Sequence, residues 1–290
     1  MPKVRKAIIP VAGYGTRFLP ATKVQPKEML PIVDKPVVHY LVEEAVESGI
    51  EEILFITNSN KHAIGDYFAR DLNLENFLKE RGKTELVDKI KHIHDLAHFM
   101  YVHQDDPLGS GDAILKGESF VGGEPFAIFY ADDIISCPDR KPALGQLISV
   151  YENVGGFVMG LINVSSDDIS KYGAIAGSKI SERLYKVNDV VEKPPADSAP
   201  STLASVGRFV ASPDIFEYIK KLDKENGEVY FASALAELAK EGEVHGYEIE
   251  GDWYDCGNKF NFWKANFEMG LKNPEISEEA NKYLKNFLKA

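Results

Sequence analysis

The fold is decided by residues 7–20, which read AIIPVAGYGTRFLP. The apolar run from Ala7 to Val11 predicts a buried strand, and the turn Gly13-Tyr14-Gly15 predicts a loop at its end. Glycines let the backbone turn sharply and approach a ligand closely. The N–H groups of such a loop form a nest for anionic oxygens. The stretch therefore indicates a phosphate-binding loop after the first strand.

Two basic residues support this interpretation. Arg17 and Lys27 add positive charges to the glycine loop, and together these features suit a triphosphate better than a neutral ligand. The alternative is an ordinary strand-to-helix turn with solvated basic side chains. Phe18 stands where a dinucleotide fingerprint has its third glycine, and the sequence has no Gly-x-x-x-x-Gly-Lys-Ser/Thr. A nicotinamide site and a Walker-type NTPase are therefore disfavoured.

Outward from this stretch, short apolar strands alternate with helices. Residues 36–48 predict a helix, with a proline early and a glycine as the stop. The alternation predicts an α/β fold with βαβ units and a mostly parallel sheet. Ligands of such sheets bind at the carboxyl ends of the strands. The predicted strands are Ala7–Val11, Ile53–Thr57, Phe99–Val102, Phe126–Ala131, Phe157–Asn163, Lys186–Glu192 and Val206–Ala211.

Three further segments have distinct patterns. Residues 61–98 are polar and helical in pattern, which predicts an insertion lying over the sheet. Ser212-Pro213 predicts the start of a helix, with serine as cap and proline in the first position. From Ile276 to Leu288, apolar residues share one helical face. That face is expected to bury against the same chain or against a second subunit.

Composition narrows the class of protein. The chain has 290 residues, 33 of them basic and 45 acidic, for a net charge of −12. We expect no nucleic-acid partner, because no basic stripe is present. We also expect no membrane span, since no apolar run approaches about 18 residues. The two cysteines favour neither a disulfide framework nor a zinc site, so a cytoplasmic location is the default.

Carboxylates follow two of the apolar segments. Asp132 and Asp133 come directly after the strand predicted at 126–131, and Asp255 follows Trp253-Tyr254. Magnesium prefers one or two carboxylates together with substrate phosphates. Asp132 and Asp255 could converge to supply that pair. Each of these aspartates could instead be a turn or capping residue.

Polar residues at other predicted strand ends fit a sugar and a base. Glu192 and Lys193 end a strand, and both could reach one ligand only where the strand ends or twists. The alternative is a solvated ion pair. The amide of Gln104 matches the edge of uracil, and Gly109 could add backbone contacts to the same base. A surface polar residue is the alternative for Gln104.

The motifs together resemble a known family. The first two motifs closely resemble the start of sugar-phosphate nucleotidyltransferases. In detail they resemble the start of the bacterial UTP–glucose-1-phosphate uridylyltransferases. The resemblance covers roughly residues 5–270. Each motif is moderately specific for this family, and their occurrence together in this order is highly specific. In chain order the motifs are Gly13-Tyr14-Gly15-Thr16-Arg17-Phe18-Leu19-Pro20, Pro26-Lys27-Glu28-Met29-Leu30-Pro31, Gln104 with Pro107-Leu108-Gly109, Asp132-Asp133, Tyr172-Gly173, Val191-Glu192-Lys193-Pro194, Val206-Gly207-Arg208 and Tyr254-Asp255-Cys256-Gly257.

The resemblance implies a fold and a reaction. The fold would be a three-layer α/β sandwich with a mixed, largely parallel sheet, formed by one nucleotidyltransferase domain over 1–290. Residues 1–135 would bind nucleotide, 136–270 would bind sugar, and 271–290 would form a C-terminal helix. The substrates would be UTP and α-D-glucose 1-phosphate, the products UDP-glucose and pyrophosphate, and the cofactor Mg²⁺. The family is commonly oligomeric, so a homodimer or homotetramer is expected.

Residue roles follow from the same resemblance. Base choice between uracil and thymine rests on it alone. The implied catalytic residues are Arg17, Lys27 and Lys193; the nucleotide-binding residues are Ala12, Gly13, Gly15, Thr16, Gln104, Gly109 and Asp132; the sugar-binding residues are Asp133, Gly173, Glu192, Lys193 and Gly207; and the metal ligands are Asp132 and Asp255.

The chain departs from the family pattern at three places. Ala131 stands where a glycine is usual, and Asp112 stands where a histidine or similar residue is frequent. Residues 230–234 replace a more polar stretch. These changes leave sugar specificity and local loop contacts open. Three alternatives remain: the same chemistry with dTTP or another sugar 1-phosphate, a catalytically silent sugar-nucleotide-binding subunit, and a nicotinamide dehydrogenase.

Overall fold

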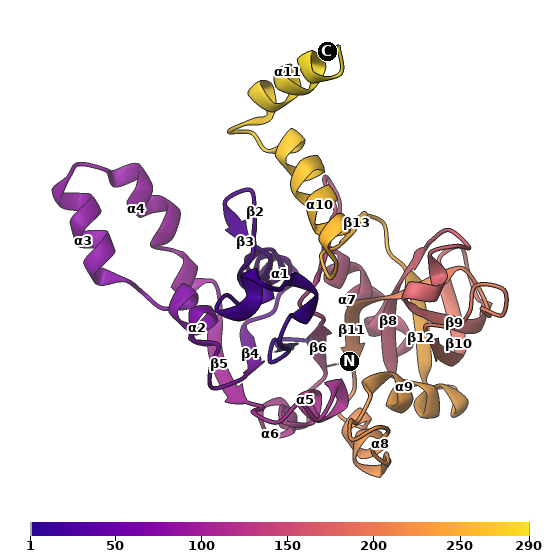
Figure 1. Ribbon diagram of the computed structural model, residues 1–290. Coiled ribbons are helices and arrows are strands. Elements are labelled where there is room, and N and C mark those ends of the chain that lie inside the picture. The colour runs from indigo at the N-terminus through magenta and orange to yellow at the C-terminus, as the bar shows by residue number, and fades with distance from the viewer. Residues whose placement is uncertain (1, 290) are drawn as a thin grey trace.

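The computed structural model describes residues 2–289 and is built around one nine-stranded sheet (Figure 1). Its strands are β1 Lys6–Pro10, β4 Glu52–Thr57, β5 His98–His103, β6 Phe126–Phe129, β8 Phe157–Asn163, β9 Gly173–Lys179, β10 Leu184–Glu192, β11 Leu203–Ala211 and β12 Val244–Glu248. They follow the order β5-β4-β1-β6-β11-β8-β12-β10-β9. The two halves of the chain join where β6 pairs with β11, so one sheet carries strands from both.

The sheet is mixed, but it is not mostly parallel as the sequence suggested. The pairs β5–β4, β4–β1, β1–β6 and β8–β12 are parallel. The pairs β6–β11, β11–β8, β12–β10 and β10–β9 are antiparallel. The βαβ reasoning holds for the first half of the chain, where helices connect the strands. In the second half, β9 and β10 are joined by a short connection, and such a hairpin forces antiparallel pairing.

Helices cover both faces of the sheet, and each face has its own apolar core. One core receives side chains from α1 Val37–Glu47, α2 His62–Phe68 and α7 Ala143–Val154. The other receives them from α5 Ser110–Leu115, α6 Glu118–Val121, α8 Ile215–Lys221 and α9 Phe231–Lys240. Within β1, Ala7 and Ile9 enter the first core and Ile8 enters the second. This alternation explains why a strand buried on both faces has an uninterrupted apolar sequence.

Four very short strands escaped the sequence analysis. β2 Pro31–Ile32 pairs with β3 Lys35–Pro36, and β7 Asp133–Ser136 pairs with β13 Asp252–Asp255. β7 begins just after β6 ends, so the β7–β13 ribbon stands at the carboxyl end of β6. Elements of two to four residues carry too little periodicity to be recognised. Short 3₁₀ helices span Thr16–Phe18, Ala21–Lys23, Lys27–Met29, Ile93–Asp95 and Ile169–Lys171.

Only part of the insertion lies over the sheet, where all of it was expected. Its first helix, α2, packs on the sheet through Ile64 and Phe68. The next two helices, α3 Leu72–Glu80 and α4 Thr84–Ile90, form an arm that extends beyond the β5 edge (Figure 1). Each of them buries one apolar residue, Leu78 or Val87, while most of its surface is polar and exposed. The arm also leaves four apolar side chains exposed instead of placing them on the sheet: Leu72, Leu74, Phe77 and Leu86.

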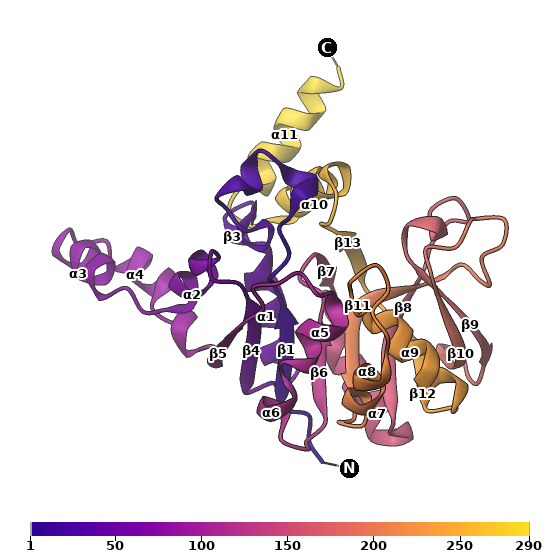
Figure 2. The ribbon, with the colours of Figure 1, turned by 60° about the horizontal axis from the view of Figure 1, so that its bottom comes forward.

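The last helix stands away from the sheet, whereas the helix before it packs on the first core through Ala265. After α10 Lys259–Lys272, the chain turns into α11 Ser277–Phe287, which projects from the body (Figure 2). The apolar face predicted here is not covered by the described part of the chain: Tyr283, Phe287 and Leu288 are 71%, 67% and 75% exposed. Docking of this face on the same chain is therefore wrong.

The helix predicted at Ser212-Pro213 begins later than expected. The first residue of α8 is Ile215, and the Ser212 hydroxyl hydrogen-bonds to the Asp214 carboxyl group rather than capping the helix. The proline fixes the turn that precedes the helix instead of its first position. Between residues 2 and 289, no helix combines the length and apolar character needed to cross a bilayer.

Candidate active site

Two adjoining cavities, of about 730 and 690 Å³, open at one edge of the sheet. Residues directly after β1, β4, β5 and β6 line the first cavity, as expected for the carboxyl ends of parallel strands. The first cavity contains Ala12, Gly13, Gly15, Thr16, Lys27, Gln104 and Gly109. The second contains Arg17, Asp133, Gly173, Gly207 and Asp255. Tyr130, Asp132, Glu192, Lys193 and Ala232 line both.

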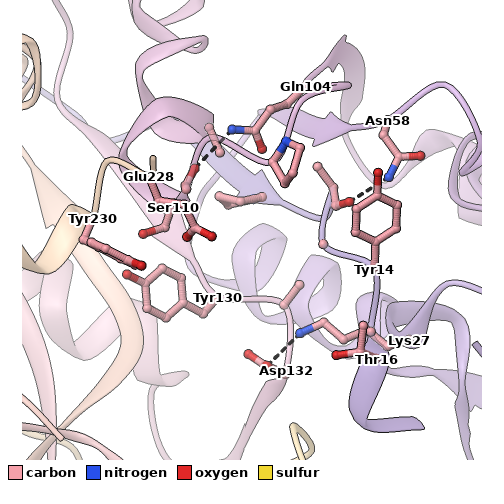
Figure 3. A pocket seen from close by; sticks show the side chains of 18 of the residues that line it. Tyr14, Thr16, Lys27, Asn58, Gln104, Ser110, Tyr130, Asp132, Glu228 and Tyr230 are labelled. Atoms are coloured by element: carbon pink, nitrogen blue, oxygen red, sulfur yellow. Dashed lines mark hydrogen bonds and ion pairs between the residues drawn. The ribbon is translucent and has the colours of Figure 1, made fainter. Parts of the chain in front are cut away.

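The glycine loop is held from three sides. Gly15 has a left-handed backbone (φ 63°), and a Cβ there would lie 3.1 Å from the Lys27 Cβ. The Thr22 hydroxyl donates to the Gly15 carbonyl at 2.7 Å. Asn58 Nδ2 donates to the Ala12 carbonyl at 2.7 Å, as Figure 3 shows. The loop is thus fixed through its carbonyls, which leaves its N–H groups for a ligand.

A buried ion pair supports the same loop and was not foreseen. Lys61 Nζ donates to the Val11 carbonyl and, at 2.9 Å, to Glu28 Oε2. The two side chains are only 9% and 1% exposed. Burial lowers the pKa of Lys61 against the opposing effect of Glu28. Lys61 lies in a polar helical stretch, so no sequence signal separated it from the surface lysines.

Lys27 and Asp132 form an ion pair between the two cavities. Lys27 Nζ lies 2.7 Å from Asp132 Oδ2, and a dashed line in the lower part of Figure 3 marks this contact. Burial opposes both charges, but their mutual attraction is stronger, so the pKa of Lys27 is raised and that of Asp132 is lowered. Arg17 adds to the lowering, and its Nη1 donates to the Gly257 carbonyl at 3.4 Å. Both side chains are therefore charged at neutral pH.

Asp132 and Asp255 converge, although 123 positions separate them in the sequence. In the β7–β13 ribbon, Asp255 lies opposite Asp133, and the Cys256 N–H donates to the Asp132 carbonyl at 2.6 Å. A Cβ built on Gly257 would lie 2.9 Å from Asp255 Oδ1 and 3.0 Å from Asp132 Oδ2. The two carboxylates therefore flank one small gap. Hard carboxylate oxygens on both sides of such a gap fit Mg²⁺.

Asp255 is oriented by a set of donors that the sequence did not reveal. Its Oδ2 accepts from the Tyr172 hydroxyl at 3.1 Å and from the Asn258 and Asn261 side-chain amides at 3.0 Å each. Its Oδ1 accepts from the Gly257 N–H at 2.8 Å. Burial and the neighbouring Asp255 charge raise the pKa of Tyr172, which therefore remains a donor at neutral pH. These contacts fix the direction of the carboxylate.

Asp133 lines the second cavity, but its carboxylate is already engaged. Oδ2 accepts from the Gly207 N–H at 2.9 Å and Oδ1 accepts from the Trp253 indole at 2.7 Å. Burial, together with the adjacent Asp132, raises the pKa of Asp133 to about 7. A Cβ on Gly207 would meet Asp133 Oδ2 at 2.6 Å and Tyr130 Cβ at 2.5 Å. Only glycine fits here, and Asp133 holds it in place.

The arginine of the Val206-Gly207-Arg208 motif lies under the site. It is fully buried, and its guanidinium donates to both carboxylate oxygens of Glu44 at 2.8–3.0 Å. It also donates to the carbonyls of Gly207 and Asp133, at 3.0 and 2.8 Å. The Arg208–Glu44 pair therefore ties α1 and β11 to the loop that carries Asp132. Glu44 was missed because 164 positions separate the partners.

Glu192 and Lys193 both face the cavities because the strand ends with a twist. Lys193 has a left-handed backbone (φ 45°), which is uncommon for a residue with a side chain. Its Nζ lies 2.9 Å from Glu192 Oε1, and both side chains are about half exposed. Gly173 is paired with Glu192 across β9 and β10, and a Cβ there would lie 3.3 Å from Glu192 Oε2. The strained turn accounts for two neighbouring side chains on one side.

Gln104 closes the far end of the first cavity. It is buried, and its Nε2 donates to the Gly109 carbonyl at 3.1 Å and to Asp112 Oδ2 at 2.7 Å. Gly109 has φ 96°, and a Cβ there would lie 2.5 Å from the Val229 carbonyl oxygen. The segment before α9 thus packs directly against the loop of Gly109. Figure 3 places Tyr130 and Tyr230 on the wall below Gln104.

Comparisons with known proteins show the family of the chain. A family model described as "Nucleotidyl transferase" matches residues 6–270. The chain belongs to the nucleotidyl transferase family. Among its relatives, the UTP–glucose-1-phosphate uridylyltransferase YngB of Bacillus subtilis is 48% identical over 288 residues, covering 99% of this chain and 96% of that protein. The UTP–glucose-1-phosphate uridylyltransferase 2 of Staphylococcus saprophyticus is 44% identical over 286 residues, covering 98% of each.

Solved structures of this family share the fold. A UDP-glucose pyrophosphorylase complexed with UDP-glucose is 40% identical, with a TM-score of 0.85, and the match covers 93% of this chain and 100% of that one. The UTP-bound UGPase from Acinetobacter baumannii is 34% identical, with a TM-score of 0.91, covering 97% and 98%. The mixed sheet with its surrounding helices is thus a nucleotidyltransferase fold.

Proposed function

We propose that this nucleotidyltransferase is a UTP–glucose-1-phosphate uridylyltransferase. It joins UTP and α-D-glucose 1-phosphate to give UDP-glucose and pyrophosphate. The observation that carries the proposal is the pair of adjoining cavities that meet at Asp132, Glu192 and Lys193. A nucleotide and a sugar phosphate can occupy one cavity each, with their phosphates adjacent. The relatives named for this activity support the choice of substrates.

The two cavities divide the recognition of substrates. In the first, the N–H groups of Gly13 and Gly15 bind the triphosphate, and Gln104 contacts the base. In the second, Glu192 binds sugar hydroxyls and Gly173 gives the ring room to approach the backbone. Most residues that line the first cavity precede residue 135, and most that line the second follow it, which supports a nucleotide-binding half over 1–135 and a sugar-binding half over 136–270.

Asp132 and Asp255 are the residues that would hold Mg²⁺. The metal, when bound, neutralises charge on the phosphates of both substrates. The donors around Asp255 keep its carboxylate directed at the gap beside Asp132. Lys27 Nζ donates to Asp132 Oδ2, and it can exchange that contact for a phosphate oxygen.

The remaining residues act by position and charge. An oxygen of the sugar phosphate attacks the α-phosphorus of UTP in line, and pyrophosphate leaves. Lys193 holds the attacking phosphate, while Lys27 and the glycine loop stabilise the departing pyrophosphate. Arg17 lies on the second-cavity side of Asp132, where its charge serves the reacting phosphates. Because charge rather than covalent chemistry limits the reaction, such groups lower the barrier by preorganisation.

The test is direct. Purified protein with UTP, glucose 1-phosphate and Mg²⁺ is expected to release pyrophosphate. Asp132→Ala should abolish release without loss of fold, whereas Asp106→Ala, which removes an exposed carboxylate outside the cavities, should not. A panel with dTTP and other sugar 1-phosphates fixes the specificity. Nucleotide binding without turnover would instead support a silent binding subunit.

We further propose a cytoplasmic homo-oligomer. UTP is a metabolite of the cell interior, which sets the location. The exposed apolar face of α11 suits a second copy of this chain, and so do Trp263 and Phe267, which stack on α10 with ring centroids 5.5 Å apart. Light scattering should give a dimer or tetramer for the wild type. Tyr283→Glu with Phe287→Glu should dissociate it, and Lys285→Ala should not.

A further inference from the structure

The amide of Gln104 has both of its N–H donors engaged inside the protein. One pairs with the Gly109 carbonyl at 3.1 Å and the other with Asp112 Oδ2 at 2.7 Å. A primary amide has two such donors and one acceptor oxygen. Figure 3 shows the oxygen of Gln104 turned toward the cavity. The group offered to a base is therefore an acceptor.

This orientation is fixed by the chemistry of the two partners. A carbonyl oxygen and an ionised carboxylate only accept hydrogen bonds. If the amide rotated by half a turn, its oxygen would face two acceptors and two hydrogen bonds would be lost. The charged partner contributes most, since hydrogen bonds to charged groups are the stronger ones. Asp112 keeps about a fifth of its side chain exposed, and Lys116 Nζ lies 3.8 Å from its Oδ2.

We propose that Asp112 sets the base specificity of this enzyme by holding the Gln104 amide with its oxygen toward the base. Uracil presents an N3–H donor, which that oxygen accepts. Cytosine presents an acceptor at the same position and is repelled. Asp112 is a positioning residue, because it acts only through Gln104. The inference rests on the proposed function and adds the selection of uracil over cytosine.

The experiment measures kcat/KM for UTP and for CTP with glucose 1-phosphate. In Asp112→Ala the amide can rotate, so the efficiency with UTP should fall while that with CTP rises. The ratio of kcat/KM for UTP to that for CTP should drop by about tenfold or more, because one charge-assisted hydrogen bond contributes at least that factor. Asp112→Asn keeps the shape and one acceptor oxygen, so its preference should lie between those of the wild type and Asp112→Ala. Asp106→Ala, in the loop between Gln104 and Gly109, should keep the wild-type preference.

The outcomes separate positioning from structural support. If Asp112 only supported the shape of the cavity, its loss would lower kcat/KM for UTP and for CTP by the same factor. An unchanged UTP-to-CTP ratio in Asp112→Ala therefore overturns the inference. Calorimetric binding of UTP and CTP to the same variants gives the ratio without turnover. If the wild type binds UTP but makes no UDP-glucose, the proposed function fails while the binding ratio still decides the role of Asp112. If the wild type binds CTP as well as UTP, the inference fails.

Discussion

Replacing Lys27 by methionine should change metal binding and turnover in opposite directions. Lys27 Nζ lies 2.7 Å from Asp132 Oδ2, and the side chains are 23% and 30% exposed. A charge-assisted hydrogen bond of this kind contributes about 1.5–3 kcal/mol net. A cation that binds Asp132 must displace or share this contact. Without Lys27, that cost disappears, and metal affinity in the absence of nucleotide should rise about tenfold or more.

Turnover should fall in the same variant. Lys27 is expected to stabilise the departing pyrophosphate, and removal of one such group costs about 10²–10³-fold in kcat. Titration with Mn²⁺, followed by electron paramagnetic resonance, measures the affinity, and pyrophosphate release measures turnover. Lys23→Met, an exposed lysine outside both cavities, is the matched control. Mn²⁺ affinity that stays equal or weakens in Lys27→Met would refute the competition between lysine and metal.

Three further changes have defined outcomes. Gly109→Ala adds a Cβ 2.5 Å from a backbone oxygen at φ 96°, so KM for UTP should rise about tenfold, while an unaltered KM would count against the tight fit. The second change concerns Glu43: burial alone would raise the pKa of its carboxyl group, but hydrogen bonds from His39 and Lys35 lower this pKa from 4.5 to about 2. The ionised Glu43 therefore stabilises the protein above pH 4.5 and loses this effect as pH falls toward 2. After allowance for partial exposure, urea unfolding should show Glu43→Gln to be about 1 kcal/mol less stable than the wild type at pH 6. A difference in unfolding free energy that stays constant down to pH 3 would contradict the lowered pKa of Glu43. Tyr172→Phe removes one donor to Asp255, the second proposed metal ligand. The Mg²⁺ concentration for half-maximal rate should therefore rise severalfold with the melting temperature unchanged, and an identical Mg²⁺ dependence would exclude a role of Tyr172 in orienting this ligand.

The glycine loop and the strand ends were predictable because their signals are local. The run from Ala7 to Val11 is apolar at every position, and its residues enter both cores. Asp132 follows another such run and lies at the predicted edge of the sheet. When strands lie side by side and parallel, the residues after each of them must meet. One local pattern per strand was therefore enough to place much of the first cavity.

The rest depends on contacts between distant segments. Nothing near Arg208 indicates that Glu44 will meet its guanidinium, and nothing near Lys61 indicates burial against Glu28. The antiparallel half of the sheet likewise follows from which strands become neighbours, not from the pattern within each one. A four-residue strand such as β13 is too short to show a period at all. Periodicity reports which faces are buried, but it does not report the partner.

The gap at Gly257 has a consequence for the use of this enzyme as a tool. A single added Cβ would sit 2.9 and 3.0 Å from the two carboxylates, and no left-handed backbone stands in the way of alanine. If these carboxylates hold the metal as proposed, one added carbon atom should block the reaction while the scaffold stays intact. We expect a Gly257→Ala protein to gather both reactants and leave them unjoined, which is the form needed to image the encounter before the bond is made.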